Sequence, residues 1–459
     1  MATKLVLIGS GLAGGLLAAY LGRHGYEVDL YERRSDPRAD NFVGGRSINL
    51  ALSTRGIYAL EQLGIADQVL GHAIPMRGRM IHPAGAGATL HFAPYDRDPS
   101  KYINSIGRAA LNTVVIEAAQ RYPNVRVHFN HRCTDVGLDT ATAQLLTTGT
   151  DADGRPVMAG VPPAVIQARA DALIGVDGAF SAVRQSMQRR LDRFDYSQSY
   201  LAHGYKELTI PPTPDGGWRM EKEALHIWPR KSFMMIALPN PDGSFTCTLF
   251  WQFEGPCSFA STKSDDDIRR FFDEQFPDAV PLMPKLLEEF HSNPTGSLVT
   301  IRCGPWSYKD KVALVGDAAH AVVPFYGQGM NAAFEDCVVL DECLAAFPNN
   351  RERAFAEYFS RRKENADALA DLAVENFIEM RDKTASRAFR AKKKLDHILE
   401  GLLPGIYLPL YTMVTFTRIP YLEAARRAGR QDRIVYASLI GLLILIVAML
   451  TLLIHSIGR

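Results

Sequence analysis

The sequence has few cysteines and no large excess of positive charge, the two features that would indicate an oxidising compartment or a nucleic-acid partner. Its 459 residues include only six cysteines, and none of them forms a CxxC pair. A chain of this length can bury a sufficient core without disulfides, so we expect reduced thiols. Lys and Arg total 51 against 50 Asp and Glu. This balance provides no strong positive field, and we therefore expect no nucleic-acid partner.

Several other signals are absent. No His and Cys residues have the spacing of metal ligands, so we expect no metal site. The first apolar run, residues 5–8, is too short for the hydrophobic region of a signal peptide and leads directly into a glycine motif. No repeat of solenoid length is present. We assign no Ser-His-Asp triad, and the catalytic residues stay unknown at this stage.

One long hydrophobic run stands near the C-terminal end. Residues 434–454 contain no charge, and as a helix they would span about 32 Å. A buried core helix is the alternative, but this segment is apolar on all faces, so its partners would have to surround it. We therefore expect a single-pass tail anchor over residues 434–455 that contacts a lipid bilayer.

The charges that flank this run predict its orientation. Four arginines precede it, whereas only His455 and Arg459 follow it; the four are Arg426, Arg427, Arg430 and Arg433. The positive-inside tendency then leaves the body of the protein in the cytoplasm. The anchor would suit the mitochondrial outer membrane in a eukaryote or the inner membrane in a bacterium.

A dinucleotide motif opens the chain. Residues 4–8 and 27–32 have the pattern of strands, and residues 12–22 that of a helix. Between the first strand and the helix lies Gly9-Ser-Gly11-Leu12-Ala13-Gly14, whose glycines permit a sharp turn and close approach of a pyrophosphate to the helix N-terminus. Glu32 ends the second strand, where a carboxylate accepts hydrogen bonds from a ribose diol. Arg33 and Arg34 follow, and an arginine at this place can also bind a 2′-phosphate, so an adenosine with this phosphate stays an alternative.

Two later segments complete a flavin site. A buried strand ends at Asp177-Gly178, although this segment alone fits any strand–turn–helix unit. A further strand delivers Asp317, which suits the hydroxyls of a ribityl chain. Gly327 and Gly329 let backbone amides approach a flat ring, and a helix over residues 330–347, with Met330 and Asn331 in its first turn, directs its positive end there.

The order of these segments predicts a divided α/β fold. We expect a discontinuous Rossmann-like FAD-binding domain with an inserted β-sheet substrate domain, followed by C-terminal helices and a transmembrane tail. The predicted boundaries are 1–75, 101–185 and 300–350 for the FAD-binding domain, 76–100 and 186–299 for the substrate domain, 351–433 for the helical region, and 434–455 for the tail anchor.

The three segments together resemble the single-component flavoprotein aromatic hydroxylases, whose prototype is p-hydroxybenzoate hydroxylase. Only one dinucleotide fingerprint is present, and in the resembled family NADPH binds transiently without a second Rossmann domain. The resemblance also implies Arg46 and Arg108 at the flavin. The predicted cofactor-binding residues are Gly9, Gly11, Leu12, Ala13, Gly14, Glu32, Arg33, Arg46, Arg108, Asp177, Asp317, Gly327, Gly329, Met330 and Asn331.

Within that group, the chain resembles the kynurenine 3-monooxygenases. The similar stretches are residues 45–53, 76–82, 203–208, 226–229, 375–380 and 411–418. The resemblance implies that the amino-acid end of L-kynurenine is held by Arg79, Tyr95, Asn376 and Tyr411, and it places Phe233, Phe325 and Glu379 near the aromatic ring or the flavin.

The residue types agree with these roles. A carboxylate in an apolar pocket needs a charge-assisted donor, which the planar fork of Arg79 supplies. Each position also has an ordinary structural alternative: a surface salt bridge for Arg79, half-buried tyrosines for Tyr95 and Tyr411, and a solvated helix face for Asn376 and Glu379.

Two positions depart from the family pattern. Tyr326 stands where we expect His in the relatives, which alters the edge of the flavin site. Arg108 follows Ser105-Ile-Gly107, a degraded form of a Ser-Ile-Asn-Arg-like stretch. Neither departure falls in the proposed carboxylate clamp.

The resemblance implies a monooxygenase that consumes NADPH and O₂ and hydroxylates L-kynurenine to 3-hydroxykynurenine through a flavin hydroperoxide. Kynurenine's aniline nitrogen already activates the ortho carbon, so positioning and water exclusion matter more than a strong base. Three alternatives stay open: a hydroxylase of another aromatic acid or quinone precursor, a flavin reductase or halogenase, and a non-catalytic FAD-binding redox sensor. The Trp-x-Trp-x-Ile motif of the halogenases is absent. The oligomeric state stays unknown.

Overall fold

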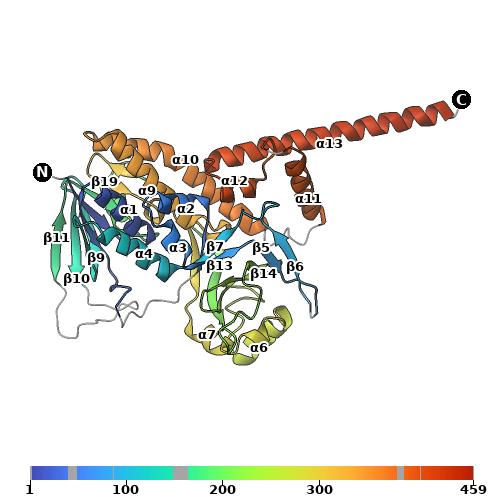
Figure 1. The fold of residues 1–459 in the computed structure, drawn as a ribbon, viewed down its shortest axis with the longest axis horizontal. Coiled ribbons are helices and arrows are strands. Elements are labelled where there is room, and N and C mark those ends of the chain that lie inside the picture. Colours follow the sequence, from blue (N-terminus) through green and yellow to red (C-terminus); the bar gives the residue numbers. More distant parts are fainter. Residues whose placement is uncertain are drawn as a thin grey trace.

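The computed structural model describes residues 3–39, 49–85, 87–147, 164–379, 387–403 and 405–457. Within these residues the chain has an α/β architecture with four sheets, as Figure 1 shows. Arg46, one of the predicted cofactor-binding residues, lies outside the described residues.

The central sheet is mainly parallel and has six strands in the order β18-β19-β12-β1-β2-β8. Its strands are β1 (Lys4–Ile8), β2 (Glu27–Tyr31), β8 (Val125–His128), β12 (Ala172–Gly175), β18 (Ser307–Tyr308) and β19 (Val312–Leu314). Ile8 pairs with Gly175, and Gly175 pairs with Leu314. Three segments far apart in the sequence therefore end at the same edge of the sheet, where α/β folds bind their ligands.

Eight of the described helices contribute to the hydrophobic core around this sheet. They are α1 (Leu12–Arg23), α2 (Thr54–Glu61), α3 (Ala66–Leu70), α4 (Arg108–Gln120), α5 (Ala182–Arg190), α8 (Asp317–His320), α9 (Gly329–Ala346) and α10 (Arg351–Ile378). The buried apolar side chains of β1, β12, α1, α4 and α9 form one continuous core. An antiparallel sheet of β9 (His131–Gly137), β10 (Thr142–Thr147) and β11 (Val165–Arg169) stands at the end of the body opposite the C-terminus (Figure 1). The predicted β-α-β start of the chain is confirmed.

A second, seven-stranded sheet has the order β17-β13-β16-β15-β14-β5-β6. Its strands are β5 (Gly78–Ile81), β6 (His91–Pro94), β13 (Asp195–Ile210), β14 (Ala224–Arg230), β15 (Phe233–Pro239), β16 (Phe245–Gln252) and β17 (Gly296–Gly304). β5 comes from the early part of the chain and pairs in parallel with β14, which brings Arg79 opposite Leu225. β17 crosses the domain boundary predicted at residue 300 and stays in this sheet.

The two sides of the second sheet face different surroundings. Helices α6 (Asp265–Gln275) and α7 (Leu286–Ser292), with the short helix η1 (Val280–Leu282), cover one side around Trp228 and Trp251. The other side contacts the short helix η2 (Pro324–Tyr326) and α10. A small antiparallel sheet of β3 (Asn49–Leu52), β7 (Ile103–Gly107) and β4 (Ala73–Met76) completes the described strands.

Three helices end the chain: α11 (Arg387–Leu402), α12 (Leu410–Phe416) and α13 (Tyr421–Ile457). Figure 1 shows α13 as a long helix that packs against the body at its start and then projects away from it. α13 is the one described helix that is long and apolar enough to cross a membrane, and none of its apolar window is buried in the protein.

A buried ionic network joins the helices beneath the central sheet. Asp336 on α9 accepts hydrogen bonds from Arg362 Nε (2.7 Å) and the Gly316 amide (3.1 Å), and His320 Nε2 lies 2.5 Å from the same carboxylate. Glu335 accepts from Arg362 (2.6 Å) and from Arg55 (2.8 Å). Burial opposes ionisation of Asp336, but His320 and Arg362 outweigh it and lower its pKa.

We expect Arg362→Leu to destabilise the fold by about 3–5 kcal/mol, because it leaves two buried carboxylates without their shared cation. The neighbouring Arg361 is a matched control, since it pairs with Glu342 at the surface. Arg361→Leu should cost less than about 1 kcal/mol. Thermal and chemical unfolding of the two variants measures the difference, and equal losses would contradict the role of the network.

Candidate flavin and substrate site

The β1–α1 turn forms a cradle that only glycine permits. Gly9 has φ of +103°, and a Cβ there would lie 2.6 Å from the Val176 carbonyl oxygen. A Cβ on Gly14 would lie 1.9 Å from the Gly9 carbonyl oxygen. Gly11 is different, because a Cβ there would meet no protein atom within 4 Å. The turn is therefore tight at Gly9 and Gly14, and it leaves open space at Gly11 beside the N-terminus of α1, as a pyrophosphate requires.

Glu32 fastens the end of β2 to this cradle. Its carboxylate accepts hydrogen bonds from the backbone amides of Ser10 (2.9 Å) and Arg34 (3.0 Å). Each carboxylate oxygen keeps a further lone pair for a ribose hydroxyl. Arg33 follows with an exposed side chain, and Leu12 and Ala13 are partly buried in the first turn of α1.

The two other strand ends carry aspartates with unused acceptor capacity. Asp177 Oδ2 accepts from the Ala182 amide (2.7 Å), whereas Oδ1 is buried and has no partner among the described residues. Asp317 lies deep in the fold, and burial raises its pKa, which the charge of Arg108 opposes. Its side chain is nevertheless exposed, so it is accessible to a ligand. This arrangement fits hydroxyl groups of a bound cofactor.

The predicted ring-binding turn is built around a left-handed glycine. Gly327 has φ of +67°, and Asn331 Nδ2 donates to its carbonyl oxygen (2.9 Å) and to that of Ala51 (2.8 Å). Asn331 Oδ1 accepts from the Ser53 amide (2.9 Å). The buried Asn331 side chain thus holds the turn in place through three contacts with the backbone. Gly329 and Met330 are the first two residues of α9, and both are partly buried.

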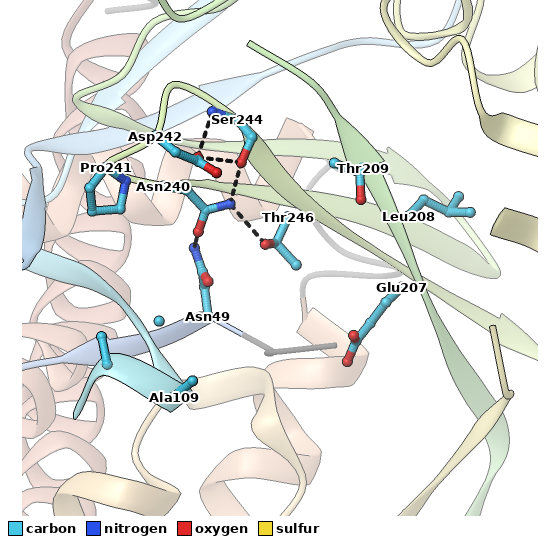
Figure 2. A pocket seen from close by; sticks show the side chains of 12 residues that line it. Asn49, Ala109, Glu207, Leu208, Thr209, Asn240, Pro241, Asp242, Ser244 and Thr246 are labelled. Carbon is cyan, nitrogen blue, oxygen red and sulfur yellow. Dashed lines mark hydrogen bonds between the residues drawn. The ribbon is translucent and has the colours of Figure 1, made fainter. Parts of the chain in front are cut away.

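Arg108 is exposed at the first residue of α4, and a cavity of about 520 Å³ lies beside this helix start. Figure 2 shows Asn49 and Asn240 pointing toward one another across its wall. Asn49 Nδ2 donates to Asn240 Oδ1 (2.6 Å), and Asn240 Nδ2 donates to Ser244 Oγ (2.9 Å). This amide chain holds the small sheet to the β15–β16 turn, and sequence reasoning missed it because Asn in a turn carries no distinctive signal.

Arg79, Tyr95, Tyr326 and Tyr411 form one cluster, although they come from four separate segments. The Tyr95 and Tyr411 rings stack with centroids 5.6 Å apart, and Tyr326 stacks on Tyr411 at 5.9 Å. The Arg79 guanidinium carbon lies 4.7 Å from the Tyr411 ring centroid and 5.5 Å from that of Tyr95. The guanidinium therefore lies against two aromatic faces, which hold it in one orientation.

Two donors in this cluster are buried without a partner. Among the described residues, neither Arg79 Nε nor the Tyr95 hydroxyl has a partner in hydrogen-bond geometry. Burial raises the pKa of Tyr95 well above its ordinary value, so the hydroxyl is neutral and can donate. Unsatisfied buried donors are costly, and they mark a place for an acceptor ligand. A carboxylate satisfies both.

The predicted residues Asn376, Phe325 and Glu379 border this cluster. Asn376 Nδ2 donates to the Phe325 carbonyl oxygen (2.7 Å), and the Phe325 ring stacks on Phe377 at 4.2 Å. Asn376 thus supports the turn that presents Tyr326. Glu379 is half-buried after the end of α10, and its charge adds to burial and Tyr411 in raising the pKa of Tyr326.

Phe233 does not join them. Its ring packs against Phe271 at 5.3 Å and Trp251 at 6.0 Å, in the core beneath α6. Successive side chains of a strand point to opposite faces, so the face of β15 opposite Phe233 carries Ile236 and Leu238. These two pack with Tyr95 instead.

The comparisons with known proteins agree with this geometry. The profile of a family described as an FAD binding domain matches residues 2–373. The kynurenine 3-monooxygenase of Myxococcus xanthus is 47% identical over 94% of this chain and 89% of its own length. The enzyme of the same name from Salinispora tropica is 48% identical over 96% and 94%, and that of Dictyostelium discoideum is 45% identical over 92% and 90%.

This chain belongs to the kynurenine 3-monooxygenase family. It is an FAD-dependent aromatic monooxygenase. Among solved structures, its fold is similar to that of 2-methyl-3-hydroxypyridine-5-carboxylic acid oxygenase, with a TM-score of 0.65, 20% identity and coverage of 92% and 97% of the two chains. P. aeruginosa PqsL matches with a TM-score of 0.63 and 19% identity over 85% and 100%.

Two glycine substitutions should separate folding from flavin binding in this family member. Gly14→Ala should impair folding, because the new Cβ would overlap the Gly9 carbonyl. Gly11→Ala should leave the unfolding temperature of the flavin-free protein almost unchanged, since its Cβ meets no protein atom. It should nevertheless lower the flavin content, because the methyl group enters the space for the pyrophosphate. Absorbance of bound flavin and thermal unfolding measure the two effects; full flavin content in Gly11→Ala would contradict the assigned cradle.

Proposed function

We propose that this protein hydroxylates L-kynurenine to 3-hydroxykynurenine, with NADPH and O₂ as co-substrates. The observation that carries the proposal is the pair of unpartnered buried donors, Arg79 Nε and the Tyr95 hydroxyl, beside the stacked ring of Tyr411. An α-amino acid carboxylate satisfies both donors, and the fork of Arg79 fixes its orientation. The high identity to kynurenine 3-monooxygenases over nearly the whole chain supports the same substrate.

The remainder of the pocket is suited to an aromatic ring. Leu225, Ile236 and Leu238 pack around Tyr95 and Tyr411 on the inner side of the second sheet. An apolar wall next to a charged clamp places the carboxylate at one end of the substrate and its ring at the other. Bound FAD supplies the activation of O₂ and the transfer of one oxygen atom. The residues of this chain hold the substrate and exclude water.

The cofactor roles follow from the same edge of the central sheet. We propose that Gly11 and the first turn of α1 hold the pyrophosphate, Glu32 a ribose, and Asp317 the ribityl chain. Arg108 and the N-terminus of α9 supply positive charge, which stabilises a reduced flavin. NADPH would bind transiently, since the sequence has one dinucleotide fingerprint. The domain boundaries predicted from the sequence stay part of this proposal, except the one at residue 300, which falls within β17.

We also propose that α13 anchors the protein in a membrane, with the body on the cytoplasmic side. The exposed apolar length of the helix and the arginines before it support this assignment. Flotation of the full chain with lipid vesicles tests it. A protein that stays in the dense fraction would leave α13 without this role.

The catalytic assignment is tested with the detergent-solubilised full chain. NADPH oxidation is followed with and without L-kynurenine, and the product is identified by mass. Stimulated oxidation with a product heavier by one oxygen supports the proposal. A yellow protein that ignores kynurenine but responds to another aromatic acid or a quinone precursor would move the substrate to that compound.

Arg79→Met should retain FAD and lose most kynurenine-stimulated NADPH oxidation, since the carboxylate loses its charged partner. A loss of about 2–5 kcal/mol corresponds to a decrease of kcat/KM by a factor of roughly 30 to several thousand. Arg77→Met is the matched control, because Arg77 lies two residues away on the surface and pairs with Glu223. Unchanged stimulation in Arg79→Met, or an equal loss in the control, would remove Arg79 from the clamp.

A further inference from the structure

Four exposed apolar side chains gather where α11 ends. Leu402 and Ile406 are each 71% exposed, Ile398 is 50% exposed and Leu403 is 43% exposed. Among the described residues no large hydrophobic side chain is more exposed than Leu402 and Ile406. We name Ile398, Leu402, Leu403 and Ile406 the apolar shelf. A soluble protein rarely leaves such a group uncovered, and continuous exposed patches mark interaction surfaces.

The shelf is fastened to α13 just before its apolar run begins. Arg427 Nη2 donates to the carbonyl oxygens of Gly405 and Ile406, both at 3.0 Å. Gln431 Nε2 donates to the Leu408 carbonyl oxygen (2.8 Å), and Lys392 on α11 pairs with Asp432 (2.7 Å). Arg427 precedes Ile434 by seven residues, so these contacts hold the shelf within about two helical turns of Ile434. Figure 1 shows one end of α11 next to α13, near the place where α13 leaves the body.

Positive charge lies on the same part of α13, just before its apolar run. Arg426, Arg430 and Arg433 are spaced four and three residues apart, so they share one helix face. All three are exposed, and among the described residues none of them forms an ion pair with an acidic side chain. Unpaired arginines beside an apolar patch match the phosphate and apolar layers at the surface of an anionic bilayer.

We propose that the apolar shelf and these three arginines dock on the surface of an anionic bilayer, as a second contact besides the span of α13. This inference rests on the proposed membrane anchor. The shelf side chains enter the boundary between headgroups and acyl chains, and the arginines bind lipid phosphates. The partner is therefore a bilayer containing acidic phospholipids, and α11 lies along its plane.

A fluorescent probe at the shelf tests the proposal in the full chain. Cys257 is the one exposed cysteine among the described residues, so Cys257→Ser provides a background for labelling. Leu402→Cys in this background carries an environment-sensitive dye, and Arg269→Cys on α6, far from α13, is the control (Figure 1). Each protein is reconstituted into vesicles of phosphatidylcholine with or without phosphatidylserine. Brominated lipids then report contact of the dye with the acyl chains.

We expect a blue shift and quenching at position 402 but not at position 269, stronger with phosphatidylserine present. Replacing Arg426, Arg430 and Arg433 together by Gln should remove most of the increase in blue shift and quenching that phosphatidylserine causes. If the protein floats with the vesicles but the dye at 402 stays in water, the shelf proposal is wrong and the anchor stands. If the protein does not float with the vesicles, the proposed anchor is wrong, and so is the shelf proposal that rests on it. Quenching that is the same with and without phosphatidylserine would overturn the role of the arginines.

Discussion

The rest of the candidate site depends on the contacts that the carboxylate of Asp336 makes. It accepts hydrogen bonds from the Gly316 amide and the Arg362 guanidinium, and it contacts the ring nitrogen of His320. It therefore joins the turn after β19 to α9 and α10. That turn carries Asp317, which we propose contacts the flavin. A buried ion network restricts the arrangement of its partners, so the packing of the helices behind this turn fixes the position of Asp317.

The substrate cluster is assembled by a different principle. The second sheet contributes Arg79 through the parallel pairing of β5 with β14, and the helices after residue 400 contribute Tyr411. Stacked tyrosine rings hold the arginine without neutralising it, so the positive charge stays available to a ligand.

The sequence predicted much of this arrangement, but not all of it. The Gly9–Gly14 motif and the acidic strand ends were identifiable because turn geometry and phosphate approach demand particular residues. Phe233 was predicted near the aromatic ring or the flavin, but its ring packs beneath α6, because the side that α6 covers decides the orientation of β15. Asn331 was predicted to bind the cofactor, and only the structure shows that its side chain also makes three contacts with the backbone. Stacking of Tyr326 on Tyr411 depends on tertiary contacts that no local pattern contains.

Only four residues lie between Ile406 of the shelf and Tyr411 of the clamp. A body held by one helix alone can swivel about that helix, whereas two contacts remove the rotation. With the shelf on the bilayer, every copy of the enzyme would present its pocket at one fixed angle and height above the lipid. A population of such molecules becomes an oriented layer, in which entry of substrate and escape of product occur on a defined side.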